Sequence, residues 1–229
     1  RFSTRQMIDL SRSGRLPWII LLMVCRLMPC GCTEQITFEG KLLMYTEHMM
    51  QSTPDKPPTG GPTKDEILAI ALKKLDLKPG EIFADIGCGT GKVSLTAAPL
   101  VSHVHAIDIR EEAYRWTCEE LQKSGFDNVT IHYGNASSIL TSLEKLDKAF
   151  VGGSRDLTDT IARLADLKVQ TIVITAVLLE TLNTAMSALQ EFDMFKEVIL
   201  VQVSKSTSLA GGFMLKPLDP VFIITGGYS

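Results

Sequence analysis

The residues best suited to chemistry form a short glycine-rich run, Asp85-Ile86-Gly87-Cys88-Gly89-Thr90-Gly91. An apolar stretch that resembles a strand, 82–84, precedes the run, and apolar residues of helical spacing follow it. Glycines at alternate positions of a strand-to-helix turn let the backbone approach a ligand, and the free N–H groups that open the helix attract polar or anionic groups. The run therefore predicts a site for a nucleotide-like cofactor, with a plain glycine turn as the alternative.

The spacing of these glycines separates two classes of cofactor. The dinucleotide fingerprint G-x-G-x-x-G requires glycine at position 92, where this chain has Lys92. The order D-x-G-x-G-x-G is instead typical of methyltransferases that use S-adenosylmethionine (SAM). We therefore predict SAM as the cofactor, with NAD as the weaker alternative. The turn residues expected to contact SAM are Gly87, Cys88, Gly89, Thr90 and Gly91.

Two further cofactor positions follow the next predicted strands. Asp108 ends the second strand, where a carboxylate can accept hydrogen bonds from both ribose hydroxyls. Asn135 and Ala136 follow the third strand after a glycine, at a place where methyltransferases often have Gly-Asp-Ala. The amide oxygen of Asn135 can still accept a hydrogen bond from the adenine amine. We expect these three residues to line the nucleoside site, with an ordinary strand-end aspartate and a simple turn as the alternatives.

Other reactive side chains give weaker signals. His103 and His105 form a close histidine pair, which we interpret as lying on opposite faces of the second strand with no cysteine or acid cluster to complete a ligand set. No metal site is therefore predicted. Cys88 is interpreted as a small residue beside the cofactor rather than a nucleophile. No catalytic residue is assigned.

The surrounding elements must hold these residues together. Thr63 is predicted to cap a first helix, with Glu66 three residues later completing a capping box. Strands are predicted at 82–85, 104–108, 129–133, 148–151, 171–175, 198–203 and 221–225. One helix is predicted to begin at residue 91, before the second strand, and another is predicted to end at about residue 125, after that strand. Two more helices are predicted at 157–165 and 178–191. The segment 205–220 is predicted to be an irregular connection rich in Ser, Gly and Pro.

Alternation of strands and helices requires right-handed crossovers and a parallel sheet. The last two predicted strands have no helix between them, so they are expected to form an antiparallel pair. The predicted fold is a Rossmann-like α/β class I SAM methyltransferase, with a mostly parallel seven-stranded sheet and an antiparallel C-terminal strand.

Composition narrows the function classes further. The 229 residues are 45% hydrophobic, enough for one sizeable core, and a net charge of −3 gives no general attraction for nucleic acid. The cysteines of the predicted domain show no pairing pattern, which favours a reduced, cytoplasmic protein. Residues 1–50 differ in composition and are interpreted as an extension of unclear status, either an upstream segment, a membrane-surface anchor or signal, or an extra helix. The predicted methyltransferase domain is 51–229.

Several strings between Pro54 and Gly226 resemble one family, the decarboxylating carbon-15 methyltransferases of anaerobic cobalamin synthesis, often called CbiT. The strings are Gly60-Gly61-Pro62-Thr63, Val151-Gly152-Gly153-Ser154, Thr175-Ala176-Val177-Leu178-Leu179-Glu180-Thr181, Gly211-Gly212-Phe213-Met214 and Asp219-Pro220-Val221. The second string also replaces the Asn-Pro-Pro-Tyr type motif of enzymes that methylate exocyclic amines of bases. Nucleic acid is thus disfavoured a second time.

The resemblance implies methylation of cobalt-precorrin-6B at carbon 15 by SAM, with loss of carbon dioxide from the ring C acetate, giving cobalt-precorrin-7. It also implies that Thr63, the turn 87–91, Asp108 and Ala136 contact SAM, and that the enzyme is a stand-alone homotetramer acting on a tetrapyrrole, with no membrane partner. Asn135 and Arg155 depart from the family pattern.

The substrate bears many carboxylates, so basic loop residues are candidates to bind it. Arg155, Lys205 and Lys216 are expected near the active face, with solvated surface charge as the alternative for each. Ser154 and Glu180 lie on the same side by topology, without an assigned role. Two other readings stay open, namely a class I methyltransferase for another small molecule, RNA or protein, and a non-enzymatic nucleotide-binding assembly domain.

Overall fold

The computed structural model describes residues 56–58, 63–153 and 155–228. The extension predicted at 1–50, the residues 60–62 of the first family string, and Ser154 lie outside this part of the chain, so the predicted domain boundary stays a prediction. The helices are α4 (Asp65–Leu75), α5 (Lys92–Ala97), the 3-10 turn η1 (Ala98–Leu100), α6 (Glu111–Ser124), α7 (Ala136–Thr141), α8 (Leu157–Asp166) and α9 (Leu179–Glu191). The strands are β1 (Ile82–Ile86), β2 (His103–Asp108), β3 (Val129–Tyr133), β4 (Lys148–Val151), β5 (Thr171–Ala176), β6 (Phe195–Val201), β7 (Ser204–Leu209), β8 (Gly212–Pro217) and β9 (Val221–Gly226).

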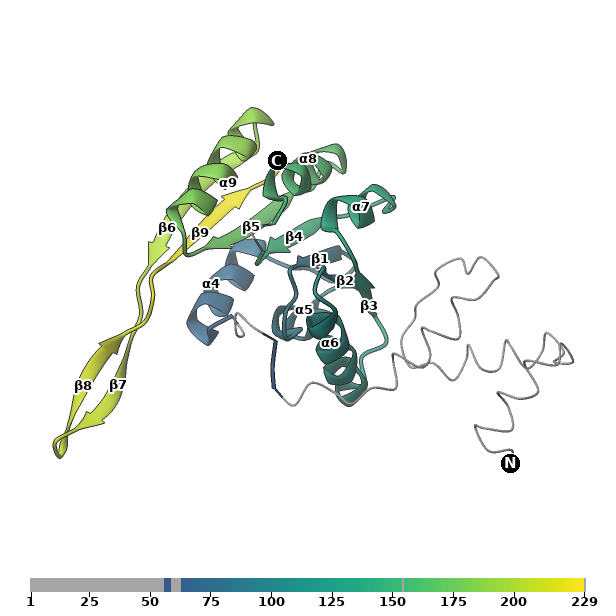
Figure 1. The fold of residues 1–229 in the computed structure, drawn as a ribbon. Coiled ribbons are helices and arrows are strands. Elements are labelled where there is room, and N and C mark those ends of the chain that lie inside the picture. The colour runs from purple at the N-terminus through teal and green to yellow at the C-terminus, as the bar shows by residue number, and fades with distance from the viewer. Residues whose placement is uncertain (1–55, 59–62, 154, 229) are drawn as a thin grey trace, which may run out of the picture. The chain divides into compact units, whose positions relative to one another are not determined.

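Seven of the strands form one twisted sheet in the order β3-β2-β1-β4-β5-β9-β6 (Figure 1). Neighbours from β3 to β5 are parallel, whereas β9 runs antiparallel to both β5 and β6. The predicted fold class is therefore confirmed. The chain order reverses between β1 and β4, and a crevice for ligands forms at such a point beyond the carboxyl ends of the strands.

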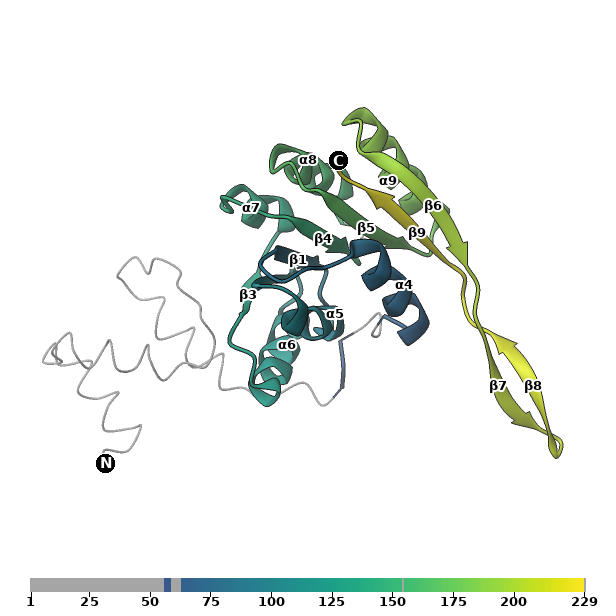
Figure 2. The same cartoon turned by 180° about the vertical axis from the view of Figure 1, so that it is seen from behind.

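Apolar side chains on both faces of the sheet explain why helices cover both sides of it (Figures 1 and 2). On one face, Ile86, Val151 and Ile174 belong to a buried core with residues of α7, α8 and α9. Helices α4, α5 and α6 lie on the other side of the sheet. Strand alternation places Phe83, Phe150 and Val173 on that other face, and all three are fully buried. Near-continuous apolar strands of this kind are typical of parallel sheets. None of the helices in the described part of the chain has the length and apolar character needed to cross a membrane.

The histidines of β2 lie on the same face of their strand, so the expectation of opposite faces was wrong. The ring centroids of His103 and His105 are 4.7 Å apart, and His105 Nδ1 lies 3.0 Å from His132 Nε2 on β3. The reason is simple geometry, because residues two positions apart in a strand project to the same side. Among the described residues, no three His, Cys, Asp or Glu side chains come together in a way that could hold a metal ion.

The segment expected to be an irregular connection contains a β-hairpin, which is a second error of the sequence analysis. Strands β7 and β8 pair antiparallel from Ser204↔Pro217 to Leu209↔Gly212 and form a separate two-stranded sheet that extends beyond the main one (Figure 1). Ala210 and Gly211 join them with φ of 48° and 81°. Positive φ at both central residues belongs to the tight turn that matches the twist of a hairpin. All the hairpin side chains are exposed, so burial left no pattern in the sequence.

Candidate functional site

A cavity of about 860 Å³ lies at the carboxyl edge of the sheet near the reversal of strand order. It collects loops that follow β1, β2, β3, β4 and β5, together with the chain before α4 and after β8. The predicted cofactor residues that line it are Thr63, Gly87, Cys88, Gly89, Thr90, Asp108, Asn135 and Ala136. Gly91 is not among the lining residues. Its Cα faces α6, because a Cβ there would lie 2.7 Å from Thr117 Cγ2.

The glycine turn is held close to two neighbouring strands. The backbone N–H groups of Gly87 and Cys88 both donate to the carbonyl of Ile107 at the end of β2, over 2.8 and 3.1 Å. Gly87 has φ +77°, and a Cβ on it would lie 2.8 Å from the backbone nitrogen of Gly153, in the loop after β4. The turn thus touches backbone on both sides, and only a residue without a side chain fits at its first glycine.

Asp85, the acid that opens the motif, is fully buried and does not line the cavity. Its Oδ2 accepts hydrogen bonds from the backbone N–H and hydroxyl of Ser94, at 2.9 and 2.5 Å, which ties β1 to the start of α5. Within the described part of the chain, its Oδ1 has no hydrogen-bond partner. Burial is the main reason that the pKa of Asp85 rises to about 7, against the lowering effect of the Ser94 hydrogen bonds.

Replacing Asp85 with asparagine is expected to change how stability depends on pH. Between pH 4 and 7 the unfolded chain ionises this acid while the folded chain keeps it protonated, so the free energy of unfolding falls as pH rises through this window. The pKa of Asp85 in the fold lies about three above its ordinary value, and this difference limits the loss of unfolding free energy to roughly 4 kcal/mol. Asparagine resembles the protonated acid and lacks this dependence. Urea unfolding of wild type and Asp85→Asn at pH 4.5 and at pH 7.5 measures this dependence. If the free energies of unfolding of the two proteins differ by the same amount at both pH values, the raised pKa of Asp85 is contradicted.

Asp108 is almost completely buried at the base of the cavity, with 3% of its surface exposed. Its Oδ1 accepts from the backbone N–H and Nε of Arg110, at 2.9 and 3.0 Å, and its Oδ2 accepts from Gly89 N–H and Arg110 Nη2, at 3.0 and 2.9 Å. Burial alone would raise the pKa of Asp108, but the hydrogen bonds from Arg110 and Gly89 lower it below its usual value. The cavity therefore presents an ionised carboxylate.

Thr63 lies at the cavity, but it does not cap α4, which corrects the predicted capping box. The helix begins at Asp65 with Lys64 as its N-cap and no side-chain cap hydrogen bond. Lys92 accounts for the difference, because its Nζ donates to the carbonyl of Thr63 at 2.9 Å and to Asp65 Oδ1 at 2.5 Å. Lys92 stands where the dinucleotide fingerprint requires glycine, and its two hydrogen bonds hold the Thr63 segment against α5.

Asn135 lines the cavity and also caps α7. Its Oδ1 accepts from the backbone N–H and the hydroxyl of Ser137, at 2.9 and 2.7 Å, and its Nδ2 donates to Asp156 Oδ2 at 2.8 Å. The adenine role predicted for this amide oxygen would require a third hydrogen bond. Asparagine is a preferred N-cap residue, and serine follows Asn135 two positions later. This local pattern could have predicted the cap of α7.

The basic residues expected to face the substrate are not all at the cavity. Arg155 lines it, whereas Lys205 pairs with Glu66 at 2.8 Å and Lys216 lies on the exposed strand β8. Glu180 is exposed in the first turn of α9 and does not border the cavity. Sequence analysis missed Thr160, buried in α8, and Leu218, which both line the cavity.

Four of the five family strings supply lining residues, although they lie far apart in the chain. The contributed residues are Thr63 before α4, Val151 at the end of β4 with Gly152 and Gly153 after it, Thr175 and Ala176 at the end of β5 with Val177, Leu178 and Thr181 after it, and Asp219 before β9 with Val221 at its start. The fourth string, 211–214, lies at the tip of the hairpin instead. The cavity therefore joins the glycine turn to the segments that carry the family resemblance.

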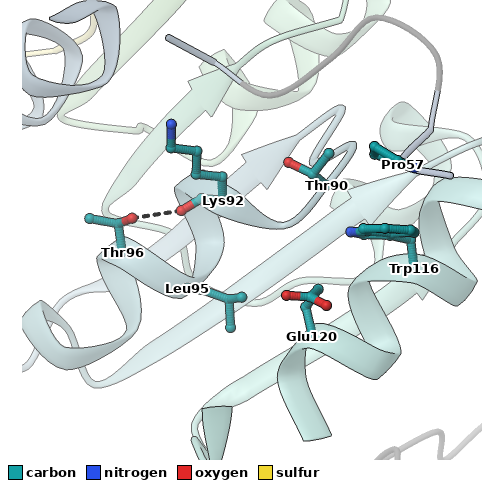
Figure 3. Close-up of a pocket in the computed structure, with 7 residues that line it drawn as sticks. All are labelled: Pro57, Thr90, Lys92, Leu95, Thr96, Trp116 and Glu120. Atoms are coloured by element: carbon teal, nitrogen blue, oxygen red, sulfur yellow. Dashed lines mark hydrogen bonds between the residues drawn. The ribbon is translucent and has the colours of Figure 1, made fainter. Parts of the chain in front are cut away.

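A second, smaller hollow of about 460 Å³ lies between α5 and α6 (Figure 3). Leu95 and Thr96 of α5 and Trp116 and Glu120 of α6 line it, with Pro57 at one end. It shares only Thr90 and Lys92 with the large cavity. Because the other predicted cofactor residues all lie elsewhere, the large cavity is the candidate functional site.

Comparison with known proteins gives a consistent result. Residues 59–225 match the family model of the precorrin methyltransferase domain. A protein of Methanosarcina mazei named "Probable cobalt-precorrin-6B C(15)-methyltransferase (decarboxylating)" is 44% identical over 173 residues, which cover 73% of this chain and 94% of that protein.

Two solved structures share both the fold and part of the sequence. The precorrin 8W decarboxylase of Methanobacterium thermoautotrophicum has a TM-score of 0.70 at 31% identity and covers 77% of this chain and 96% of its own. The precorrin-6y C5,15-methyltransferase of Geobacter metallireducens has a TM-score of 0.68 at 31% identity, with coverage of 78% and 94%. By the family model and by these relatives, the chain belongs to the precorrin methyltransferase family.

Proposed function

We propose that this protein transfers a methyl group from SAM to carbon 15 of cobalt-precorrin-6B and releases carbon dioxide from the ring C acetate, giving cobalt-precorrin-7. The observation that carries the proposal is the shared cavity, where the glycine turn and four of the five family strings meet. The 44% identity to the Methanosarcina mazei relative supports the choice of reaction and substrate.

The residues at the cavity fit SAM as the methyl donor. The ionised carboxylate of Asp108 suits a ribose diol, and the positive-φ turn at Gly87 exposes backbone where a side chain would not fit. When bound, SAM supplies a methyl group already activated on a sulfonium. The main task of the chain is then to hold a nucleophilic ring carbon at near-attack distance from that methyl group, and a strong base is unnecessary.

The substrate half of the cavity has the means to orient a polycarboxylate. Arg155 at the cavity can pair with one carboxylate of the substrate, and Thr175 and Thr181 offer hydroxyl groups. Decarboxylation breaks the bond between the acetate methylene and its carboxyl carbon, and the conjugated macrocycle takes up the electron pair. A proton from solvent then converts the methylene into a methyl group. The task of the chain in this step is to position the carboxylate.

The decisive experiment incubates the protein with cobalt-precorrin-6B and methyl-labelled SAM, and measures label in the corrinoid together with released carbon dioxide. We expect one carbon dioxide for each methyl group transferred. Methylation without carbon dioxide would contradict the two-part reaction. Label that appears in RNA, protein or another small molecule, but not in the tetrapyrrole, would assign a different methyltransferase activity.

We also propose a cytoplasmic homo-oligomer, a tetramer as the family resemblance suggests. The buried thiol of Cys88 forms no disulfide among the described residues, which suits a reducing compartment. The hairpin supports self-association, because Phe213 and Leu215 on one face of β8 are 83% and 68% exposed. Apolar side chains exposed in one contiguous place mark a surface for another protein.

Replacing both Phe213 and Leu215 with aspartate is expected to reduce the molar mass in solution, measured by light scattering during size-exclusion chromatography. The two residues project to the same face of β8, and charges there prevent burial against another copy. A Thr207→Asp variant, which places one charge on the partner strand opposite Met214, serves as control. A wild-type mass of 25.1 kDa, that of a single chain, would contradict self-association.

A further inference from the structure

The side chain of Arg110 lies on the carboxylate of Asp108 in a two-point contact. Nε donates to Oδ1 at 3.0 Å and Nη2 donates to Oδ2 at 2.9 Å, so the planar guanidinium faces both oxygens at once. Asp108 is buried, whereas about a third of the Arg110 side chain, 34%, is exposed. The arginine therefore covers the carboxylate from the cavity side, where it is itself a lining residue.

The contact with Arg110 occupies acceptor positions on Asp108 that a ribose diol would need. A carboxylate offers about four hydrogen-bond acceptor positions, two on each oxygen. The backbone N–H groups of Gly89 and Arg110 fill one on each oxygen, and both belong to fixed parts of the turn and of the segment before α6. The guanidinium fills the second position on each oxygen. A ribose diol, which donates one hydrogen bond from each hydroxyl, needs the same pair of positions.

We propose that Arg110 is a built-in competitor for the ribose subsite, which must leave the Asp108 carboxylate before an adenine nucleoside can bind and which returns as the nucleoside departs. This inference rests on the proposed function, because it takes Asp108 as the ribose anchor. The atoms exchange without any covalent step, two N–H donors being replaced by two O–H donors.

The surroundings of Arg110 allow such an exchange. Nη2 lies 3.6 Å from the position that a Cβ on Gly89 would occupy, so the guanidinium rests against the glycine turn itself. Asp108 is the main cause of the raised pKa of Arg110, and the charge of Glu112 in the first turn of α6 contributes as well. The negative charge of Glu112 therefore attracts the guanidinium in addition to the carboxylate of Asp108.

The exchange has a consequence for turnover. Because only the open arrangement binds the nucleoside, the apparent affinity falls by the fraction of molecules that are open. The closed arrangement also competes with S-adenosylhomocysteine (SAH), the product left after methyl transfer. The guanidinium thereby weakens product binding without touching the reacting atoms.

Calorimetric titration with SAH tests the proposal. SAH carries no net charge near pH 7, so loss of a guanidinium charge does not by itself attract or repel it. We expect Arg110→Ala to bind SAH roughly 10-fold more tightly than wild type, or about 1.4 kcal/mol. Arg110→Lys, which keeps the charge but lacks the fork, is expected to fall between them. The matched control is Arg115→Ala, since Arg115 lies on α6, pairs with Glu111 at 2.5 Å and borders neither cavity.

Adenosine and 2′,3′-dideoxyadenosine form a second ligand pair. They separate competition between the guanidinium and the ribose diol for Asp108 from a general effect on the site. Adenosine is expected to gain affinity in Arg110→Ala, whereas 2′,3′-dideoxyadenosine, which has no diol, is expected to gain none. SAH binding that is equal or weaker in Arg110→Ala overturns the competitor role while the proposed cofactor stands. Equal gains for the two nucleosides overturn it too. Absence of SAH binding in wild type and both Arg110 variants, with cooperative thermal unfolding retained, overturns the proposed function itself.

Discussion

Asp108→Ala is expected to lower the affinity for SAH by about 100-fold or more. Hydrogen bonds to a charged acceptor contribute about 1.5–3 kcal/mol each, and in the proposed complex this carboxylate accepts two from the ribose in place of the two from the Arg110 guanidinium. Its loss also leaves the Arg110 guanidinium without its main partner beside the site. Calorimetry with SAH measures the effect, and titration with NAD should show no binding to either protein.

A matched change of charge far from the cavity controls for this substitution. Asp166 at the end of α8 pairs with Arg163 at 2.6 Å, is exposed and does not line the cavity. Asp166→Ala should bind SAH as wild type does. Retention of near wild-type affinity by Asp108→Ala would remove Asp108 as the ribose anchor, and tighter binding of NAD than of SAH would reject the predicted cofactor class.

Gly87→Ala is expected to destabilise the protein by about 2–4 kcal/mol and to abolish SAH binding. A φ of +77° costs an alanine about 1–2 kcal/mol, and the added methyl group would lie 2.8 Å from the backbone nitrogen of Gly153. Because neither neighbour of that contact is a flexible side chain, the turn and the loop after β4 must separate. Chemical unfolding gives the change in stability, and calorimetry gives the change in binding.

Gly125 provides the control for backbone strain alone. It follows the last residue of α6 with φ +74°, close to that of Gly87, but apart from its chain neighbours no atom of the described residues lies within 4 Å of a Cβ built on it. Gly125→Ala should therefore cost only the strain, about 1–2 kcal/mol, and leave SAH binding unchanged. Equal losses in the two variants would mean that the contact with Gly153 has no energetic weight.

Much of the sheet was predictable because its strands are buried on both faces. Strands β3 and β4 begin and end at the predicted residues, and β1, β2, β5 and β9 differ by one residue at an end. Their apolar runs are separated by turns and amphipathic helices, so burial leaves a clear record in the sequence. β6 lies at the sheet edge, starts three residues earlier than predicted and is only partly buried, so its pattern is weaker.

The features that sequence missed depend on contacts rather than on burial. The start of α4 is set by Lys92, twenty-nine residues beyond Thr63, and no local capping pattern contains that information. The hairpin β7–β8 has no buried face, and its Ser-rich and Gly-containing strands resemble a loop. The pairing of Arg110 with Asp108 was accessible in principle, because an arginine two residues after a strand-end acid can reach back to it.

The hairpin also bears on how the sheet is assembled during folding. Strand β9 occupies an interior place between β5 and β6, although it follows all the other strands in the chain. β6 leads directly into β7, and β8 leads back into β9, so the four strands are two stretches of one antiparallel ribbon that turns at Ala210 and Gly211. A two-residue turn closes at a small entropic cost, and hairpins form within about 1–10 μs. Zippering from this tip brings Val201 to Val221 without a search through open chain, so the ribbon can dock on β5 as a preformed unit.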